Sequence, residues 1–355
     1  MKALILAGGK GTRLRPITHT SAKQLVPVAN KPILFFAIEA IRDAGITDIG
    51  IIVGDTASEI EEAVGCGADF GVKTTYIRQD EPLGLAHAVK IAEDFIQKDS
   101  FVMFLGDNLI KDGITPLVNE FREESPNSQI LLARVPNPSD FGVAEIVDGK
   151  VVGLEEKPKE PKSSYALVGV YMFDSTIYEA VKAIRPSARG ELEITDAIQY
   201  LIEHGHDVRS HIIKGWWKDT GKLEDMLEAN RVALSGADRD IRGKVDDRSR
   251  VIGEVILDEG AEVVNSELRG PLVIGSGTVI RDSYVGPFTA ISTGCRITGA
   301  EIEFSIVLEN STIENFRPRI EGSLIGRDVH IEQGPTKPRA FRFMVGDSSW
   351  IQVPE

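Results

Sequence analysis

From residue 1 to about residue 235, short apolar runs alternate with longer segments whose apolar residues recur at helical spacing. The short runs, rich in β-branched or aromatic residues and bounded by turn residues, are typical of strands, and the longer segments of helices. Asn30 and Pro32 mark the start of the first helix near residue 31, and Gly45 marks its end. The predicted strands are residues 2–8, 49–54, 73–77, 101–107 and 130–135, and the predicted helices are residues 31–46, 57–65, 85–97 and 115–124. This alternation predicts an α/β fold with a Rossmann-like, mostly parallel sheet flanked by helices.

Two polar or glycine-rich segments follow predicted strands of this sheet. The glycine-rich stretch 8–11 follows the first strand, and the sequence LGDN at 105–108 lies at the end of the fourth. Ligands of open α/β sheets bind beyond the carboxyl ends of the strands. We therefore expect the two segments to meet at one ligand site.

After about residue 245 the pattern changes, and aliphatic residues recur nearly every six positions. These residues are Ile274, Ile280, Val285, Ile291, Ile297, Ile302, Leu308, Ile313, Ile320, Ile325 and Ile331. A six-residue repeat is typical of a three-sided coil with its aliphatic side chains stacked inward, and it resembles the hexapeptide-repeat left-handed parallel β-helix. The repeat has five- and seven-residue steps, so an antiparallel β domain is the alternative. We expect domains at 1–235 and 245–355, with a polar connector at 235–250.

Composition narrows the classes of function. The 355 residues are 42% apolar and 26% charged, which is typical of a globular chain with a sizeable core. The net charge of −14 argues against a general nucleic-acid binder. No apolar run reaches the roughly 20 residues of a membrane-spanning helix, and no signal-peptide pattern precedes the first strand. We therefore expect a cytoplasmic protein without nucleic-acid or membrane partners. Cys66 and Cys295, far apart in sequence, predict buried free thiols.

The stretch LILAGGKGTRLRP at 4–16 admits several kinds of phosphate loop. A Walker A loop would need glycine where Leu4 stands and Ser or Thr where Gly11 stands. A dinucleotide fingerprint would need its third glycine where Leu14 stands. A simple tight turn would leave Arg13 and Lys23 unexplained. Bare backbone N–H groups beside a guanidinium form an anion site, so we predict binding of phosphates by another kind of loop.

Nine motifs in one order complete this pattern. They are LAGGKGTRLRPIT, SAKQLVPVANKP, QDEPLGLAHA, FLGDN, FGVAE, LEEKP, ALVGVY, RGELEITDAI and WWKDTG. Over about residues 1–235 this set resembles the sugar nucleotidylyltransferases, and among them the long form of the glucose-1-phosphate thymidylyltransferases. The resemblance implies that an oxygen of glucose 1-phosphate attacks the α-phosphate of dTTP in line, giving dTDP-glucose and pyrophosphate without a covalent enzyme intermediate. It leaves a uridylyltransferase, or another sugar-1-phosphate nucleotidylyltransferase, as the alternative.

The resemblance also implies a nucleotide site. Arg13 and Lys23 would hold the phosphates, Gln24 and Gln79 would lie against the base, and Gly84 would let the backbone approach it. Lys10, where serine is frequent in short relatives, would either contact phosphate or point to solvent. The implied nucleotide-binding residues are Leu6, Gly8, Gly9, Gly11, Thr12, Arg13, Gln24, Gln79, Pro82, Gly84 and Asp107.

A Mg²⁺ site and a sugar-phosphate site are implied in the same way. Asp107 and Asp219 would supply the oxygen ligands that Mg²⁺ prefers. Lys157 would stabilise charge on the transferring phosphoryl group, and Glu156 would accept hydrogen bonds from sugar hydroxyls. Trp216 and Trp217 would wall the sugar pocket or pack in the core. The implied sugar-phosphate residues are Asn108, Gly142, Glu156, Lys157, Leu167, Val168, Arg189 and Trp217, and the implied catalytic residues are Arg13, Lys23, Lys157 and Asp107.

Other classes of function remain open. A β-helix can carry an acyl-transfer site with a histidine base, and His330 is the sole histidine after residue 211. A non-catalytic nucleotide-sugar-binding homologue would tend to lose the loop arginine or the metal carboxylates, whereas Arg13, Asp107 and Asp219 are present. The flat faces of a β-helix favour self-association, so we expect a homo-oligomer.

Overall fold

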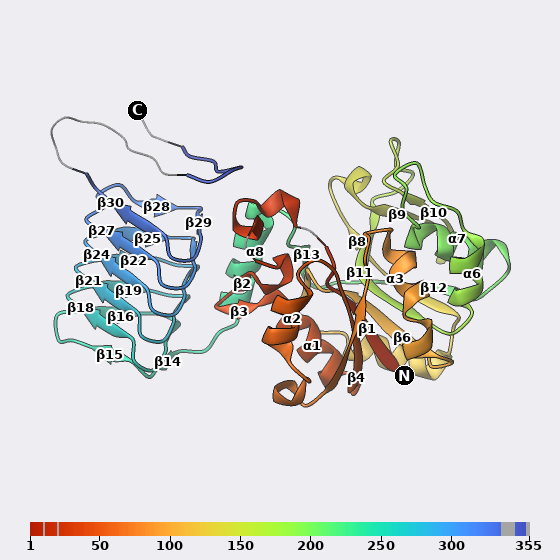
Figure 1. Ribbon diagram of the computed structural model, residues 1–355, viewed down its shortest axis with the longest axis horizontal. Helices are drawn as coiled ribbons and strands as arrows, with labels where there is room; N and C mark the ends of the chain where they lie inside the picture. Colours follow the sequence, from red (N-terminus) through yellow and green to blue (C-terminus); the bar gives the residue numbers. More distant parts are fainter. Residues whose placement is uncertain (10, 20, 335–344, 353–355) are drawn as a thin grey trace. The chain divides into compact units, whose positions relative to one another are not determined.

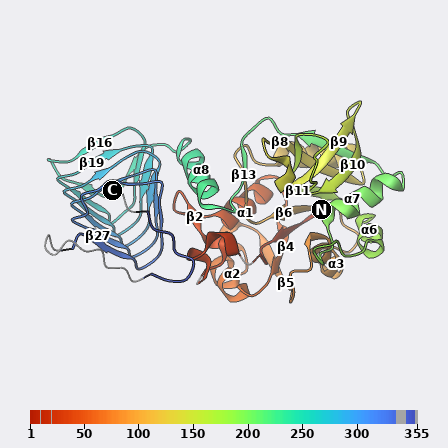
Figure 2. The same cartoon turned by 90° about the horizontal axis from the view of Figure 1, so that it is seen from above.

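The computed structural model describes residues 1–9, 11–19, 21–334 and 345–352, which fall into two compact units (Figures 1 and 2). The first unit comprises Met1–Lys10, Ser21–Leu25 and Ile33–Asp219, and the second comprises Gly11–Thr20, Val26–Pro32 and Thr220–Glu355. The tip of the glycine-rich loop and the stretch before the first helix thus belong to the second unit. The domain limits 1–235 and 245–355 stay predictions.

The first unit is built on a mixed sheet with the order β10-β9-β11-β6-β1-β4-β5, and β8 pairs with β11 and β12. Its strands are β1 (Lys2–Leu6), β4 (Asp48–Val53), β5 (Lys73–Arg78), β6 (Phe101–Leu105), β8 (Ser128–Arg134), β9 (Gly142–Val147), β10 (Lys150–Glu156), β11 (Tyr165–Phe173) and β12 (Val208–Ile212). Strands β6, β1, β4 and β5 run parallel, and β11 runs antiparallel to β6. The five predicted strands are confirmed. A separate ribbon pairs β7 (Asn108–Ile110) with β13 (Trp217–Asp219).

Helices cover both faces of this sheet (Figure 1). They are α1 (Ile33–Asp43), α2 (Ala57–Val64), α3 (Leu85–Ile91), α4 (Glu93–Ile96), α5 (Thr115–Glu124), α6 (Ile177–Ala183) and α7 (Ile194–Glu203), and short 3-10 turns include η3 (Lys23–Leu25), η4 (Ala68–Phe70) and η5 (Pro138–Asp140). Alternate residues of β1 show the two layers: Ile5 packs with α1, α2 and α5, whereas Leu4 packs with α3, α6 and α7. The four predicted helical segments are present, although the first begins at Ile33 rather than near residue 31, and the segment 85–97 is divided at Ala92 into α3 and α4.

In the second unit, successive strands stack into three parallel sheets over the described residues, which confirms a β-helix (Figure 2). Its strands are β14 (Asp240–Ile241), β15 (Lys244–Val245), β16 (Arg250–Ile252), β17 (Val255–Leu257), β18 (Glu262–Val264), β19 (Glu267–Arg269), β20 (Leu272–Ile274), β21 (Val279–Arg281), β22 (Tyr284–Val285), β23 (Thr289–Ile291), β24 (Arg296–Thr298), β25 (Glu301–Glu303), β26 (Ile306–Val307), β27 (Thr312–Glu314), β28 (Ile320–Glu321), β29 (Leu324–Ile325) and β30 (His330–Glu332). Ile280, Ile297 and Ile313 stand in register on neighbouring coils and are fully buried. Because β14 and β15 lie within 235–250, the prediction of a connector there is wrong: the first coil already begins at Asp240.

The second unit also contains α8 (Leu223–Leu234), the turns η1 (Thr12–Leu14) and η2 (Ile17–His19), and a hairpin of β2 (Pro27–Val28) and β3 (Lys31–Pro32). Pairing of β3 with β2 delays the start of α1. At the hairpin turn Ala29 and Asn30 have φ values of 48° and 60°. The buried Asn230 of α8 holds this turn, since its Oδ1 accepts from the N–H of Ala29 (2.8 Å) and its Nδ2 donates to the carbonyl of Phe288 (2.9 Å). Asn30 in turn donates to the carbonyl of Ile291 (2.8 Å).

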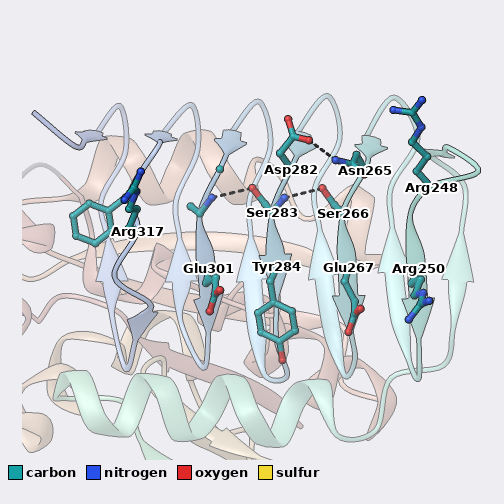
Figure 3. Close-up of a pocket in the computed structure, with 13 residues that line it drawn as sticks. Arg248, Arg250, Asn265, Ser266, Glu267, Asp282, Ser283, Tyr284, Glu301 and Arg317 are labelled. Atoms are coloured by element: carbon teal, nitrogen blue, oxygen red, sulfur yellow. Dashed lines mark hydrogen bonds between the residues drawn. The ribbon is translucent and has the colours of Figure 1, made fainter. Parts of the chain in front are cut away.

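One face of the β-helix, on the sheet β16-β19-β22-β25-β28, carries an open groove of about 690 Å³ (Figure 3). Glu267, Tyr284 and Glu301 line it from successive strands. At its rim, the Oγ of Ser266 accepts from the N–H of Ser283 (3.1 Å), a side-chain ladder that ties neighbouring coils. No predicted site residue within the described ranges lines this groove. Among the described residues, no helix combines the length and apolar character that a bilayer crossing requires. Both cysteines are free thiols, and Cys295 is buried, but the prediction of a buried thiol is wrong for Cys66, which is exposed.

We predict that Ile297→Ala lowers the free energy of unfolding by about 2–5 kcal/mol, because it removes a buried side chain from the β-helix stack and leaves a cavity. Urea denaturation followed by circular dichroism measures the change. The exposed neighbour Arg296 is the matched control, and Arg296→Ala should shift stability by less than about 0.5 kcal/mol. Equal effects of the two substitutions would contradict this account of the core.

Candidate active site

Two of the predicted site carboxylates meet at the carboxyl end of β6. Asp107 lies between β6 and β7, and Asp219 on β13 stands opposite Asn108 of β7. Lys23 of η3, with a side chain only 6% exposed, is ion-paired with Asp107 and places its Nζ 3.6 Å from Oδ1 of Asp219. The structure thus brings Lys23, Asp107 and Asp219 together.

Lys23, Asp107 and Asp219 are called the carboxylate centre below, and the neighbours of Asp107 shift the pKa of this one carboxyl group. Burial by itself would raise the pKa of Asp107, but the ammonium of Lys23 and the amide of Asn108 favour the ionised form. The net effect is a pKa of Asp107 below its usual value. Asp107 therefore stays a carboxylate across the neutral range.

Asn108 fixes the orientation of the carboxylate centre. Its Nδ2 donates to Oδ1 of Asp107 (2.9 Å), while its Oδ1 accepts from the indole Nε1 of Trp217 (2.6 Å) and from the N–H of Gly169 (3.3 Å). A Cβ on Gly169 would lie 2.7 Å from this amide, so only glycine fits there. Trp217 also meets the ring of Phe141 edge to face, with centroids 5.7 Å apart. Trp217 therefore borders the carboxylate centre and donates a hydrogen bond to Asn108.

The donor set of the carboxylate centre fits Mg²⁺. Asp107 and Asp219 already converge on one cation, the ammonium of Lys23, and they offer the carboxylate oxygens that Mg²⁺ prefers. Within the described residues, no cluster of three or more acidic, histidine or cysteine side chains forms a metal cage. Two protein ligands would leave the other coordination positions to phosphate oxygens and water, the usual arrangement for Mg²⁺ at nucleotide sites.

A second polar cluster forms around Glu156 at the end of β10. Glu156 Oε2 accepts from Oγ1 of Thr195 (3.4 Å), and its Oε1 lies 3.7 Å from Nζ of Lys157. A Cβ on Gly142 would come within 2.7 Å of both Leu167 and Thr195, so glycine is required for this close packing. Burial raises the pKa of Glu156 above its usual value, although Lys157 and, to a smaller extent, Arg189 oppose the shift. A group of this kind is suited to hydrogen-bonding sugar hydroxyls.

Arg189, a predicted phosphate ligand, is held by acidic side chains. Its Nε and one terminal nitrogen donate to the carboxylate of Glu193 at 2.9–3.2 Å, and further carboxylates lie 3.4 Å (Glu156) and 3.5 Å (Glu191) away. Glu193 is almost fully buried and also accepts from the hydroxyl of Ser187 (2.7 Å). The sequence reasoning gave Glu193 and Thr195 no role. The sequence feature that could have indicated a partner for Arg189 is the run RGELEIT, in which acidic residues follow the arginine at short spacing.

The glycines that follow β1 lie beside two glutamines. A Cβ on Gly8 would lie 3.6 Å from Oε1 of Gln79, and one on Gly9 would lie 3.6 Å from Nε2 of Gln24. Gln24 is 2% exposed, and its buried Oε1 has no hydrogen-bond partner among the described residues. A buried acceptor without a partner is costly, which favours a ligand donor at this position.

The remaining predicted residues divide between the two units. In the second unit, Gly11 has φ 60°, and Thr12 and Arg13 are exposed. In the first, Gly84 has φ 103°, and a Cβ there would collide with the backbone of Leu192, so this glycine is needed for packing. Pro82 is exposed, whereas Leu6, Leu167 and Val168 pack in the apolar clusters. Lys10 lies outside the described residues.

Comparison with known proteins agrees with this geometry. A family model described as nucleotidyl transferase matches residues 2–236. The chain belongs to the nucleotidyl transferase family. It is 59% identical over 355 residues to the glucose-1-phosphate thymidylyltransferase of Streptomyces antibioticus, with 99% of each chain covered. It is 46% identical to the low-salt glycan biosynthesis nucleotidyltransferase of Haloferax volcanii, with 99% of this chain and 100% of the relative covered.

A solved structure matches about two thirds of the chain. It comes from Bacillus anthracis, is provisionally designated a glucose-1-phosphate thymidylyltransferase, and contains a sucrose. Its TM-score is 0.63 at 43% identity, covering 66% of this chain and 95% of that chain. These comparisons confirm the resemblance found in the nine motifs and extend it, in the two full-length relatives, to the β-helix.

The raised pKa of Glu156 gives a pH-dependent stability. Protonated Glu156 is favoured by the folded state, so its contribution to stability is full below the ordinary pKa of 4.5 and is lost as pH rises through the raised folded value. We predict that Glu156→Gln melts at a higher temperature than the wild type at pH 8. The difference should shrink as pH falls toward 4.5. Thermal melts at several pH values measure it, and a Gln variant that is less stable at pH 8 would contradict the assignment.

Proposed function

We propose that this chain is a glucose-1-phosphate thymidylyltransferase, which transfers the thymidylyl group of dTTP to glucose 1-phosphate and releases pyrophosphate. The observation that carries the proposal is the carboxylate centre, with Lys23 set between Asp107 and Asp219 at the carboxyl end of β6. The choice of dTTP and glucose 1-phosphate is supported by the full-length similarity to the Streptomyces antibioticus enzyme.

The substrates carry both the nucleophile and the leaving group. A phosphate oxygen of the sugar phosphate forms a bond to the α-phosphorus of dTTP while the bond from that phosphorus to the bridging oxygen of pyrophosphate breaks. No proton has to move when the attacking phosphate is ionised. The protein therefore has to align two polyanions and to offset the charge between them. Buried or half-buried cations held in place by carboxylates suit that task.

Each part of the first unit has a role in this scheme. Asp107 and Asp219 would hold Mg²⁺, which when bound would draw negative charge from the α-phosphate and from the leaving pyrophosphate. Lys23 would stay beside them and meet the phosphates. Arg13 belongs to the second unit, and a phosphate contact from the planar donors of its guanidinium stays a prediction. Gln24, whose carbonyl oxygen is buried without a partner among the described residues, would accept a hydrogen bond from the nucleotide.

The sugar phosphate would bind at the Glu156 cluster. Lys157, 46% exposed at the end of β10, has a φ of 42°, an unfavourable conformation that its N–H bond to the carbonyl of Phe141 (3.0 Å) helps to maintain. This conformation places Lys157 beside Glu156, where it would meet the attacking phosphate. Arg189 would exchange one of its carboxylate partners for the same phosphate. The homo-oligomeric state and the cytoplasmic location stay predictions.

We predict that the wild-type protein releases pyrophosphate with dTTP and glucose 1-phosphate in the presence of MgCl₂. UTP should be used less well, by about 10–200-fold if the pocket accommodates the thymine methyl group. A panel of nucleoside triphosphates and sugar 1-phosphates, with a coupled pyrophosphate assay, measures these preferences. A preference for ATP or GTP would exclude the proposed nucleotide, and a preference for UTP would make the chain a uridylyltransferase.

We predict that Asp107→Asn and Asp219→Asn each lower kcat/KM by about 100-fold or more, since each removes a carboxylate that would hold the metal against the phosphates. The Mg²⁺ concentration for half-maximal rate should rise in both variants. Asp94→Asn, at an exposed position of α4, is the matched control and should behave as the wild type. Unchanged Mg²⁺ dependence in either active-site variant would refute the metal assignment.

A further inference from the structure

The side-chain amide of Gln79 is held in one orientation by two neighbours. Its Nε2 lies 3.3 Å from the carbonyl oxygen of Gly84 and 3.0 Å from Nδ1 of His87. A carbonyl oxygen only accepts hydrogen bonds, so the amide atom that faces Gly84 has to be the NH₂ group. The two hydrogens of this group can then serve the two neighbours at once.

This arrangement also defines the state of His87. For Nδ1 to accept from Gln79, the imidazole has to be neutral, with its proton on Nε2. Burial lowers the pKa of His87, and the nearby Lys90 lowers it further. Both effects favour the neutral ring. His87 lies in the first turn of α3, directly after the tight Gly84, so the helix start fixes the position of its ring.

The carbonyl oxygen of Gln79 consequently points to the glycine turn. Oε1 lies 3.6 Å from the position that a Cβ on Gly8 would occupy. The carbonyl oxygen of Gln79, a hydrogen-bond acceptor, therefore faces the space beside Gly8 that a side chain at this position would occupy. In the opposite amide orientation the NH₂ group would stand there instead, and the carbonyl would face the carbonyl of Gly84.

We propose that His87 is a positioning residue that makes the site select thymine over cytosine, by holding the Gln79 amide with its carbonyl toward the nucleotide. This inference rests on the proposed function, in which Gln79 lies against the base. Thymine carries a hydrogen on ring nitrogen N3, which the carbonyl of Gln79 can accept. Cytosine has a lone pair at N3, which would face that carbonyl without a hydrogen between them. Uracil shares the N3–H of thymine, so this contact does not separate thymine from uracil.

The test compares three substitutions of His87 in the full chain. His87→Asn keeps an acceptor for the Gln79 amide, His87→Leu removes it, and His87→Arg supplies donors only. We expect the preference for dTTP over dCTP in kcat/KM to be retained in the Asn variant. It should fall by about 10-fold or more in the Leu variant, the range expected when a polar pairing is lost, and further in the Arg variant. The ratio of dTTP to dUTP should stay unchanged in all three.

A double-mutant cycle separates positioning from a general structural effect. In a Gln79→Leu background, His87→Leu should change the dTTP to dCTP ratio no further, because the amide that it orients is gone. His204→Leu, at the exposed end of α7, is the matched control for loss of a histidine, and melting temperatures of all variants report on folding. For variants with little turnover, calorimetric dissociation constants of dTTP and dCTP give the same ratio.

The outcomes distinguish the inference from the proposed function. If the wild type uses dTTP but His87→Leu keeps the full preference over dCTP, the inference is wrong and the proposed function stands. A dTTP to dUTP ratio that changes as much as the dTTP to dCTP ratio would also overturn it. If the wild type neither binds nor converts dTTP, the proposed function fails, and the inference fails with it.

Discussion

Burial of the Lys23 ammonium is the constraint on which the first unit's site depends. Removing a charge from water costs several kcal/mol unless carboxylates and hydrogen bonds compensate for it. Lys23, only 6% exposed, obtains this compensation from Asp107, 84 residues away in sequence, and from Asp219 on β13. The lysine can be buried only where both strand ends are in place. The same ion pairs that stabilise the fold therefore bring together the side chains that we propose for metal and phosphate binding.

Close backbone approaches give this charged centre its geometry. Gly169 lets β11 contact the amide of Asn108, and Gly142 lets β9 pack against Leu167 and Thr195. Asn108 then orients Asp107 and bonds to Trp217, so one buried amide connects the carboxylate centre to the aromatic wall. A side chain at either glycine would separate these strands by a fraction of an ångström. Shifts of that size are large compared with the tolerance of a phosphoryl-transfer site.

Much of this could be predicted from the sequence, because the relevant signals are local. Alternating apolar periods predict the strands and helices of the first unit, and the six-residue repeat predicts the inward column that includes Ile280 and Ile297. That Asp107 and Asp219 belong to one site was implied by the resemblance of the nine motifs to a known family rather than by a local signal. The pairing of distant strands could not be predicted from local patterns. No local pattern indicates that Pro32 pairs with a strand before α1, or that the residues after Asp240 already form the first coil.

The roles of several polar residues that are buried or partly buried were hidden for the same reason. Glu193, His87 and Asn230 act through partners that only the folded chain places beside them. In the sequence, Glu193 is one acidic residue among several, and His87 is a histidine on a short apolar helix. Their function depends on which atom faces which neighbour. That information resides in geometry rather than in residue type.

The charges of the site explain why a divalent cation would be a condition for binding. Lys23 with Asp107 and Asp219 carries a formal charge of −1, and Arg189 and Lys157 with Glu156, Glu191 and Glu193 also carry −1. The formal net charge of the whole chain is also negative, −14 at pH 7. Without a further cation, both clusters would therefore repel a triphosphate and a sugar phosphate. One divalent cation at the two aspartates changes the first cluster from −1 to +1. The ammonium of Lys23 is already paired with the two aspartates. A second cation on those aspartates would compensate their charge and leave Lys23 able to contact the phosphates as well.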